Sequence, residues 1–401
     1  MRKTSEELQN IMEQENCDRI WSWSKINCFH TSPFEYMLKY IKHIPEDRQD
    51  CIYTTTGTIC HDILEKLYTG QIKYEDMAEQ FEDGWLVAYN ISQLKFDRND
   101  EEKNKKIGSK YYENLKHFFD NHTMLEHKPM IEQFVKAKIG DNLFFGYIDC
   151  VFKDNDNNFN IVDFKSSSIY KGDTLTEKSG QLCVYAMGLN QAGVPFDKIK
   201  ICFNFLKYCT IQYEQKNGAI KTRDVERNKI GESLQSNVKI WLKEFGYGDQ
   251  IDDYLKMLLD ANSIKVLPEE VQKKYKIYDC YVYIPLTQKL IDNWINIITT
   301  TIEDISLREE DYKETESELC FWDSDESVEK NSYYFATLSG YSGKLHKPYK
   351  AYLDKLEEMK DGTDMFNGIG SNTENEVIST KPINNNKNSA EVDLSWLDSL
   401  S

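Results

Sequence analysis

The stretch that decides the fold runs from residue 146 to residue 185. It holds three short motifs: GYID at 146–149, IVDFK at 161–165 and QLCVY at 181–185. The first two are apolar, strand-like runs, and each ends on a carboxylate, with a lysine two residues after the second one. Because side chains at i and i+2 of a strand point to the same face, we expect Asp163 and Lys165 to emerge together, beside Asp149.

Two carboxylates and an ammonium group at strand ends predict a site for a hard cation with a cationic partner. The carboxylates would hold Mg²⁺ or Mn²⁺, which activates water for phosphodiester hydrolysis. Lys165 would neutralise charge on the attacked phosphate or position the water. A salt bridge at a strand end is the alternative for an isolated Asp-x-Lys. The flanking apolar run, the preceding Gly146-x-x-Asp149 and the short hairpin spacing make the combination more specific.

Gln181 and Tyr185 lie four residues apart on an expected amphipathic helix over 175–189, so they share a face. The short loop after Lys165 brings that helix close enough to overhang the site. We expect these side chains to hydrogen-bond to a phosphate or to the carboxylate and lysine of the site. A tyrosine in an apolar stripe with a glutamine beside it is an equally good interpretation of the pair alone.

His61 follows Gly57-x-x-x on an expected helix over 56–68. A single histidine is commonly a surface or core residue. Together with the other motifs it becomes a candidate nitrogen ligand for the metal, a role that suits neutral imidazole. Glu132, on the strand before Asp149, is a weaker candidate that either supports the site or faces solvent.

Composition limits the class of protein. The chain has 401 residues, enough for one large domain or two ordinary ones, and 40% of them are hydrophobic. Its net charge of −18 argues against non-specific coating of nucleic acid. Ten cysteines without a Cys-x-x-Cys pair, a polar N-terminus and no apolar run long enough to span a bilayer favour a cytoplasmic protein that does not enter membranes, in the host cytoplasm if it is viral.

The hydrophobic period changes along the chain, from helical to strand-like and back. We expect strands at 131–139, 143–152, 159–165, 199–208, 210–215 and 280–284, and later helices at 225–245, 251–259, 286–307 and 347–360. The cluster 154–158 is a hairpin turn signal. The order predicts an α/β core, a mixed central sheet flanked by helices, with helical N-terminal and C-terminal additions. The expected parts are 1–126 (mostly helical), 127–221 (α/β core), 222–360 (helical) and 361–401 (an acidic, disordered tail).

The ordered motif set resembles a known family. Gly-x-x-x-His, Gly-x-x-Asp, Asp-x-Lys and Gln-x-x-x-Tyr are similar to the RecB-type branch of the PD-(D/E)XK nucleases, which includes CRISPR-adaptation nucleases and many phage exonucleases. The resemblance covers about residues 20 to 210, and more loosely continues to about 358. It implies a restriction-endonuclease-like core and a metal-dependent DNA exonuclease acting in replication, recombination or DNA processing. The Asn, Lys and Ile content is compatible with a phage origin.

The resemblance also implies roles for single residues. His61, Asp149, Asp163 and the backbone carbonyl of Phe164 would ligate Mg²⁺ or Mn²⁺. Lys165 would be the catalytic lysine, and Gln181 and Tyr185 would contact substrate or brace the site. Many relatives hold an iron–sulfur cluster on four cysteines. Here the N-terminal cysteine is replaced by Ser32 and the C-terminal region keeps only Cys320, so we expect no cluster.

Two questions stay open at the level of sequence. The fold could instead serve as a catalytically silent DNA-binding or scaffold subunit, or take an RNA substrate. In the tail, Val392, Trp396 and Leu400 follow helical spacing in an acidic setting within 390–401. This segment is either a peptide that docks on a replication or recombination partner (a helicase, polymerase or single-strand-binding protein) or an incidental apolar cluster.

Overall fold

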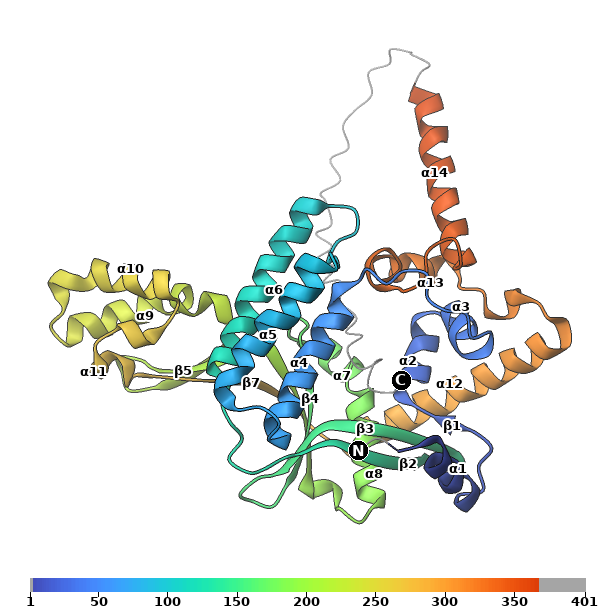
Figure 1. Ribbon diagram of the computed structural model, residues 1–401, viewed down its shortest axis with the longest axis horizontal. Coiled ribbons are helices and arrows are strands. Elements are labelled where there is room, and N and C mark those ends of the chain that lie inside the picture. Colours follow the sequence, from blue (N-terminus) through green and yellow to red (C-terminus); the bar gives the residue numbers. More distant parts are fainter. Residues whose placement is uncertain (1–2, 368–401) are drawn as a thin grey trace. The chain divides into compact units, whose positions relative to one another are not determined.

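A computed structural model of the chain describes residues 3–367 (Figure 1). The chain divides into two compact units. The first unit comprises residues 3–24 and 50–300, and the second comprises residues 25–49 and 301–367. The predicted tail peptide at 390–401 lies outside the described residues. All residues proposed above for the metal site belong to the first unit.

A mixed sheet forms the centre of the first unit and confirms the expected α/β core. In the described residues it has seven strands: β1 (Ile20–Trp21), β2 (Met130–Ile139), β3 (Asn142–Lys153), β4 (Phe159–Lys165), β5 (Ile199–Glu214), β6 (Ile220–Glu226) and β7 (Tyr275–Ile284). The main order is β1-β3-β4-β5-β6, with β2 paired to β3 and β7 paired to β5. β1 runs parallel to β3 and β4 parallel to β5, whereas the other pairs are antiparallel.

The β3–β4 hairpin brings the two motif carboxylates together. Its turn is the predicted polar cluster, where the Asp154 carboxylate accepts hydrogen bonds from the backbone N–H groups of Asp156 and Asn158. The antiparallel register pairs Cys150 with Val162, so Asp149 and Asp163 are the next residues along the two strands. Asp149 therefore lies within β3 rather than at its end, where the sequence pattern had placed it.

Helices cover the sheet of the first unit. They are α1 (Ser5–Gln14), α4 (Ile52–Thr69), α5 (Met77–Trp85), α6 (Glu101–Asn121), α7 (Asp173–Glu177), α8 (Gly180–Gln191), α9 (Ile230–Glu244), α10 (Ile251–Ala261) and α11 (Glu269–Gln272), with a π-helical turn, η3 (Leu86–Ile91), after α5. α4, α5 and α6 lie side by side (Figure 1) and share one hydrophobic core with β3, β4 and β5. α8 packs mainly on β2.

The far half of β5 forms an extension of the sheet. There β5 pairs with β6 and β7, and the three strands share a separate core with α9, α10 and α11. Figure 1 shows β5 running from the site region into this extension. The sequence-based prediction was wrong in two places here. β5 is one continuous strand instead of two, and the expected helix start at residue 225 lies in β6.

The second unit is built from helices and short turns. α2 (Trp23–Thr31) and α12 (Gln288–Thr315) cross the boundary between the units, and α3 (Pro33–Tyr36), η1 (Met37–Ile41), η8 (Glu318–Phe321), α13 (Asp325–Lys330), η9 (Tyr334–Leu338) and α14 (Lys347–Asn367) follow along the chain. Within this unit α3 packs against η1 and η8. A buried polar network, described below, joins its N-terminal and C-terminal segments.

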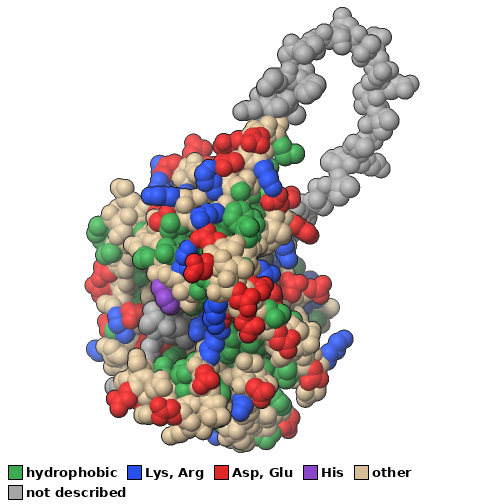
Figure 2. All heavy atoms as spheres, turned by 90° about the vertical axis from the view of Figure 1, so that its right-hand side faces the viewer, with side chains coloured by type: hydrophobic (Ala, Val, Ile, Leu, Met, Phe, Trp, Pro, Cys, Tyr) green, Lys and Arg blue, Asp and Glu red, His purple; other side chains and the backbone are tan. Residues whose placement is uncertain are grey.

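Charged side chains of both signs are interspersed on the face drawn in Figure 2, rather than gathered into one field. Among the described residues, no helix has the length and apolarity needed to cross a membrane.

Candidate functional site

The helix α4 places His61 against the sheet. Its buried face carries Gly57, Cys60 and Leu64, which pack toward the core. This leaves His61 only 17% exposed, with Nε2 2.9 Å from the carbonyl oxygen of Phe164 and Nδ1 3.6 Å from Oδ2 of Asp149. The imidazole thus lies between two groups that the sequence had proposed as metal ligands.

Asp149 and Asp163 are both buried. Asp149 Oδ2 accepts a hydrogen bond of 3.3 Å from the Phe164 N–H group. Burial, and next to it the charge of Asp163, raises the pKa of Asp149 well above its ordinary value, although Lys165 opposes the shift. Two carboxylates that repel one another in a place shielded from water form an environment that a divalent cation would relieve.

Lys165 ends β4 and is buried with its partner. Its Nζ lies 2.8 Å from Oδ1 of Asp163, as the i, i+2 spacing predicts. Neither oxygen of Asp163 accepts a hydrogen bond from the described residues. The ammonium group holds Oδ1 by charge, and the Asp163 carboxylate lies close enough to Asp149 that their side-chain contact also raises the pKa of Asp149.

Gln181 and Tyr185 lie on α8, where the Gln181 amide donates a hydrogen bond of 2.9 Å to the Tyr185 hydroxyl. Burial raises the pKa of Tyr185, and the charges of Asp149 and Asp163 add to the shift, so the phenol lies close to both carboxylates. A Cβ atom at Gly146 would come within 2.5 Å of the Tyr185 ring. The glycine of Gly146-x-x-Asp149 thus gives α8 its close approach to β3. The two side chains bond to each other beside the carboxylates.

Glu132 contributes more to the site than the sequence indicated. Its neighbours Ile131 and Gln133 pair with Cys150 and Ile148, which places Glu132 opposite Asp149. Its φ of +49° is unusual for a residue other than glycine. The charge of Glu132 adds to the rise in the Asp149 pKa. The sequence named Glu132 as a weaker candidate, and strand register, which the sequence alone does not give, was needed to place it opposite Asp149.

The donor set fits a hard divalent cation. It offers one imidazole nitrogen, carboxylate oxygens and a backbone carbonyl, which are ligands that Mg²⁺ and Mn²⁺ accept. Among the described residues, however, no three His, Cys, Asp or Glu side chains are already gathered at metal-binding spacing. Mutual repulsion of Asp149 and Asp163 gives a physical reason, because the ligands would draw together only around the ion.

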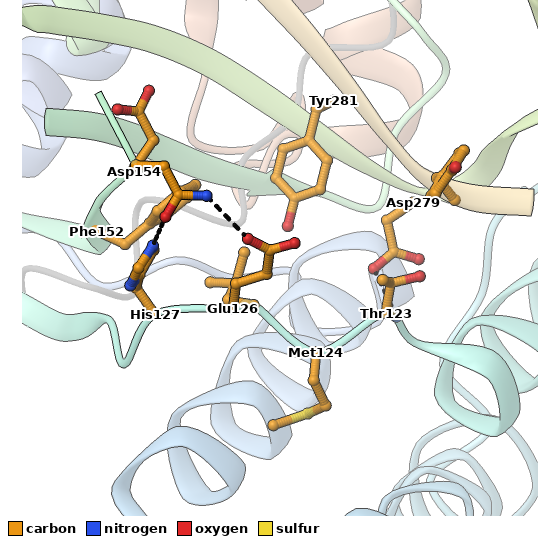
Figure 3. Close-up of a pocket in the computed structure, with 11 residues that line it drawn as sticks. Thr123, Met124, Glu126, His127, Phe152, Asp154, Asp279 and Tyr281 are labelled. Carbon is orange, nitrogen blue, oxygen red and sulfur yellow. Dashed lines mark hydrogen bonds between the residues drawn. The ribbon is translucent and has the colours of Figure 1, made fainter. Parts of the chain in front are cut away.

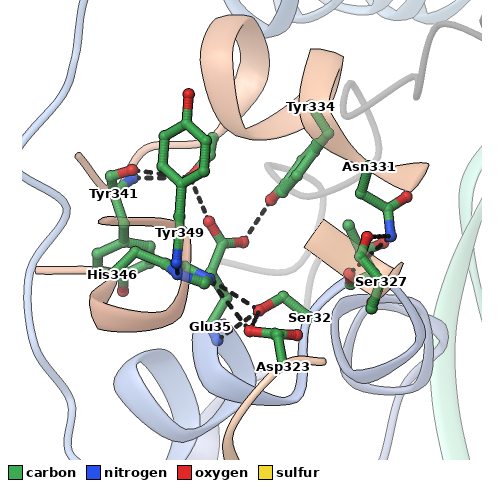
Figure 4. A network of polar contacts seen from close by, with 11 residues as sticks. Ser32, Glu35, Asp323, Ser327, Asn331, Tyr334, Tyr341, His346 and Tyr349 are labelled. Atoms are coloured by element: carbon green, nitrogen blue, oxygen red, sulfur yellow. Dashed lines mark hydrogen bonds and ion pairs between the residues drawn. The ribbon is translucent and has the colours of Figure 1, made fainter. Parts of the chain in front are cut away.

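Ser32, which the resemblance of the motifs would match to a cluster cysteine, lies in the second unit within a buried polar network (Figure 4). Its hydroxyl donates to Asp323 Oδ2 at 2.8 Å, accepts from the Glu35 N–H group at 3.0 Å and lies 3.0 Å from His346 Nε2. The Glu35 carboxylate accepts hydrogen bonds from Tyr334 and Ser339. Polar contacts therefore join the N-terminal and C-terminal segments in this part of the second unit.

A separate cavity of about 240 Å³ opens in the first unit (Figure 3). It lies between the loop after α6, the end of β3 and β7, and the side chains of Glu126, His127, Asp279 and Tyr281 line it. None of the residues proposed for the metal site lines this cavity.

The family model described as the PD-(D/E)XK nuclease superfamily matches residues 20–322 of the chain. The curated proteins contain no significant match.

Proposed function

Because the chain belongs to the PD-(D/E)XK nuclease superfamily, we propose that it is a divalent-metal-dependent deoxyribonuclease that hydrolyses phosphodiester bonds. The observation that carries this proposal is the convergence of His61, Asp149, Asp163 and Lys165 from α4, β3 and β4. A chain that had given up catalysis would have no need to bury two carboxylates side by side beside a lysine.

Each residue has a role that follows from its position. His61 Nε2, the carboxylates of Asp149 and Asp163, and the carbonyl of Phe164 would hold Mg²⁺ or Mn²⁺. When bound, such an ion lowers the pKa of a coordinated water and polarises the phosphate. Lys165 would place its positive charge on the attacked phosphate or orient the water. The Gln181–Tyr185 pair would brace the carboxylates or contact the substrate backbone.

The finer assignment rests on the resemblance of the ordered motifs to the RecB-type branch. It leads us to propose a 3′- or 5′-directed exonuclease of a replication, recombination or DNA-processing system, such as a phage would carry. A protein partner that engages residues 390–401 remains part of this proposal on the strength of the sequence alone. We place the reaction in the cytoplasm on the same basis.

A catalytically silent DNA-binding or scaffold subunit is the second candidate. Metal binding separates it from the nuclease. Saturating Mn²⁺ should raise the melting temperature of the wild-type chain, because a ligand that binds only the folded state stabilises it, and should leave that of Asp149→Ala unchanged. Absence of any shift in the wild type would favour the scaffold.

Cleavage itself is tested with end-labelled linear and circular DNA, single- and double-stranded, in Mg²⁺ or Mn²⁺, with an RNA of the same sequence. Degradation of linear DNA only is expected of an exonuclease, and the labelled end gives its polarity. Nicking of circular DNA would point to an endonuclease. Degradation of the RNA but not of the DNA would exclude DNA as the substrate.

A further inference from the structure

Two side chains of α4 reach beyond the helix through hydrogen bonds. His61 Nε2 lies 2.9 Å from the Phe164 carbonyl oxygen, and the Tyr68 hydroxyl lies 2.7 Å from Nε2 of His122. Seven residues, about two helical turns, separate His61 from Tyr68, so both project from the same side of α4. The helix that would carry the metal-binding imidazole is therefore fastened at a second point.

His122 belongs to a buried chain of charged and polar groups. Its Nδ1 lies 2.6 Å from Oδ2 of Asp279, and the Arg227 guanidinium lies 2.5 Å from Oδ1 of the same carboxylate. The N–H group of Thr123 donates a further hydrogen bond of 3.1 Å to Oδ2. Figure 3 shows Asp279 on β7 directed at the loop that carries Thr123. Although burial acts in the opposite direction, Arg227 and His122 hold the pKa of Asp279 below its ordinary value.

The partners link the sheet to α4 through the His122 ring. An ionised carboxylate only accepts, so Nδ1 of His122 carries a proton and donates to Asp279. Nε2 on the other side of the ring forms the hydrogen bond with the Tyr68 hydroxyl. Arg227 in turn donates through Nε to the Leu206 carbonyl on β5, at 2.9 Å. A single ordered path thus leads from the sheet to α4.

We infer that Tyr68, His122, Asp279 and Arg227 form a positioning network that fixes the rotation of α4 and thereby holds His61 at the Phe164 carbonyl. Tyr68 acts through His61 and is not a catalytic residue. The expected effect on DNA cleavage rests on the proposed nuclease function. The expected effect on the position of the His61 ring does not.

The ends of α4 give a reason why the helix would need such a positioning network. The helix starts at Ile52 with Cys51 as N-cap, and no side chain caps it. It ends at Thr69, and the C-cap Gly70 has a left-handed conformation. The apolar inner face of α4 packs in the shared core, and the hydrogen bond of Tyr68 adds a directed restraint on rotation about the helix axis. Misplacement of a reacting group by about 1 Å is enough to slow a reaction 100-fold.

The test compares two variants that each lose one phenolic oxygen bound to the same histidine. Tyr68→Phe removes the bond from α4 to the His122 ring. Tyr74→Phe is the matched control, because the Tyr74 hydroxyl donates to the backbone oxygen of His122 at 2.9 Å from the short 3₁₀ turn Tyr74–Asp76, outside α4. Both variants are made in the full chain, and melting of the metal-free proteins should show similar small losses of stability.

The first readout needs no metal. In protein labelled with ¹³C at His Cε1, the His61 signal, assigned by its loss in His61→Gln, should move in Tyr68→Phe and stay in place in Tyr74→Phe. The second readout is the Mn²⁺ concentration that gives half-maximal cleavage. It should rise on the order of tenfold in Tyr68→Phe, the lower end of what loss of support for a metal ligand costs, with little change at saturating Mn²⁺.

The two readouts separate the inference from the proposed function. Equal His61 signals in both variants, or equal Mn²⁺ requirements, would overturn the positioning role. If the wild-type chain neither binds Mn²⁺ nor cleaves DNA while the His61 signal still moves only in Tyr68→Phe, the network stands and the nuclease proposal fails.

Discussion

The first unit buries Asp149 and Asp163 beside Lys165, whereas the second unit buries Glu35 and Asp323 among hydroxyl groups and an imidazole. In the first cluster, Asp163 receives no hydrogen bond from the described residues and depends on a cation. In the second, Tyr334 and Ser339 donate to both oxygens of Glu35, and Ser32 donates to Asp323 Oδ2, while Asp323 Oδ1 has no hydrogen-bond partner among the described residues. Burial holds the pKa of His346 at about 4, so the imidazole beside Asp323 is neutral.

The difference indicates how to tell two kinds of buried polar cluster apart. The Glu35 carboxyl group accepts from a neutral donor at each oxygen and is satisfied within the fold, and its donors join distant segments of the chain. Carboxylates held by charge, with lone pairs left over, are costly to the folded protein unless another ligand arrives. The second cluster therefore has the character of structural support, and the first has that of a binding site. The predictions below test this contrast, from the largest effect to the smallest.

The largest effect is expected from Lys165→Ala. Loss of the ammonium group removes the charge that would meet the attacked phosphate, and removal of one such electrostatic group costs about 10²–10³ in rate. The measurement is the initial rate of cleavage of linear DNA in Mg²⁺. Lys200→Ala is the control, because Lys200 on β5 only pairs with Asp154 in the hairpin turn, at 2.7 Å. Comparable activity in both variants would remove Lys165 from the site.

In the absence of metal, Asp149→Asn is expected to stabilise the protein, whereas most substitutions of buried residues destabilise it. Replacing a carboxylate whose pKa is raised by burial and by Asp163 relieves repulsion, so we expect the metal-free protein to gain about 2 kcal/mol of unfolding free energy. The Mn²⁺-induced rise in melting temperature should be lost at the same time. Urea unfolding with and without Mn²⁺ measures both effects.

Two controls bracket that result. Asp154→Asn, in the β3–β4 turn, should lower stability, because Lys200 and Asn158 hold the pKa of this carboxylate below its ordinary value. In the second unit, Tyr334→Phe should cost about 1–3 kcal/mol by leaving a buried Glu35 oxygen without its donor. A loss of stability in Asp149→Asn would break the contrast between the two clusters.

Local patterns in the sequence were enough to predict much of the first cluster. Strand alternation gave the Asp163–Lys165 pair, the polar run 154–158 gave the turn, and helical spacing gave the Gln181–Tyr185 pair. These relations all lie within a few residues or one hairpin. The order of the motifs gave the superfamily, which the family match confirms.

The second cluster and the support of α4 could not be predicted in this way. Ser32 meets Asp323 and His346 across 291 and 314 residues, and Tyr68 meets His122 across 54. Periodicity carries no information on such pairings. Glu132 was underrated for a related reason, since its place opposite Asp149 follows from strand register.

The smallest effect concerns pH and the second cluster. Burial raises the pKa of Glu35 and of Asp323 to about 7 each, from ordinary values near 4. Between those values the folded state holds protons that the unfolded chain releases, so stability is greatest at low pH and is lost as pH rises through 7. We expect a fall of about 1 kcal/mol for each carboxyl group between pH 6.5 and pH 8. Hydrogen exchange of peptides from the second unit measures it.

Charged neighbours change how steeply stability falls with rising pH, but they do not reverse the fall. The Glu46 charge raises the pKa of Glu35 further and Lys39 lowers it, while the low pKa of His346 costs stability only as pH falls below its ordinary value of 6.5. Above pH 6.5 the carboxyl groups therefore dominate. Glu35→Gln, which cannot ionise, should flatten the fall by about half, and Glu46→Gln should shift it to lower pH only slightly. The opposite result would be stronger protection of the second unit from hydrogen exchange at pH 8 than at pH 6.5 in the wild-type chain. It would show that these carboxyl groups are already ionised in the folded state. The two clusters would then hold their charges in the same way.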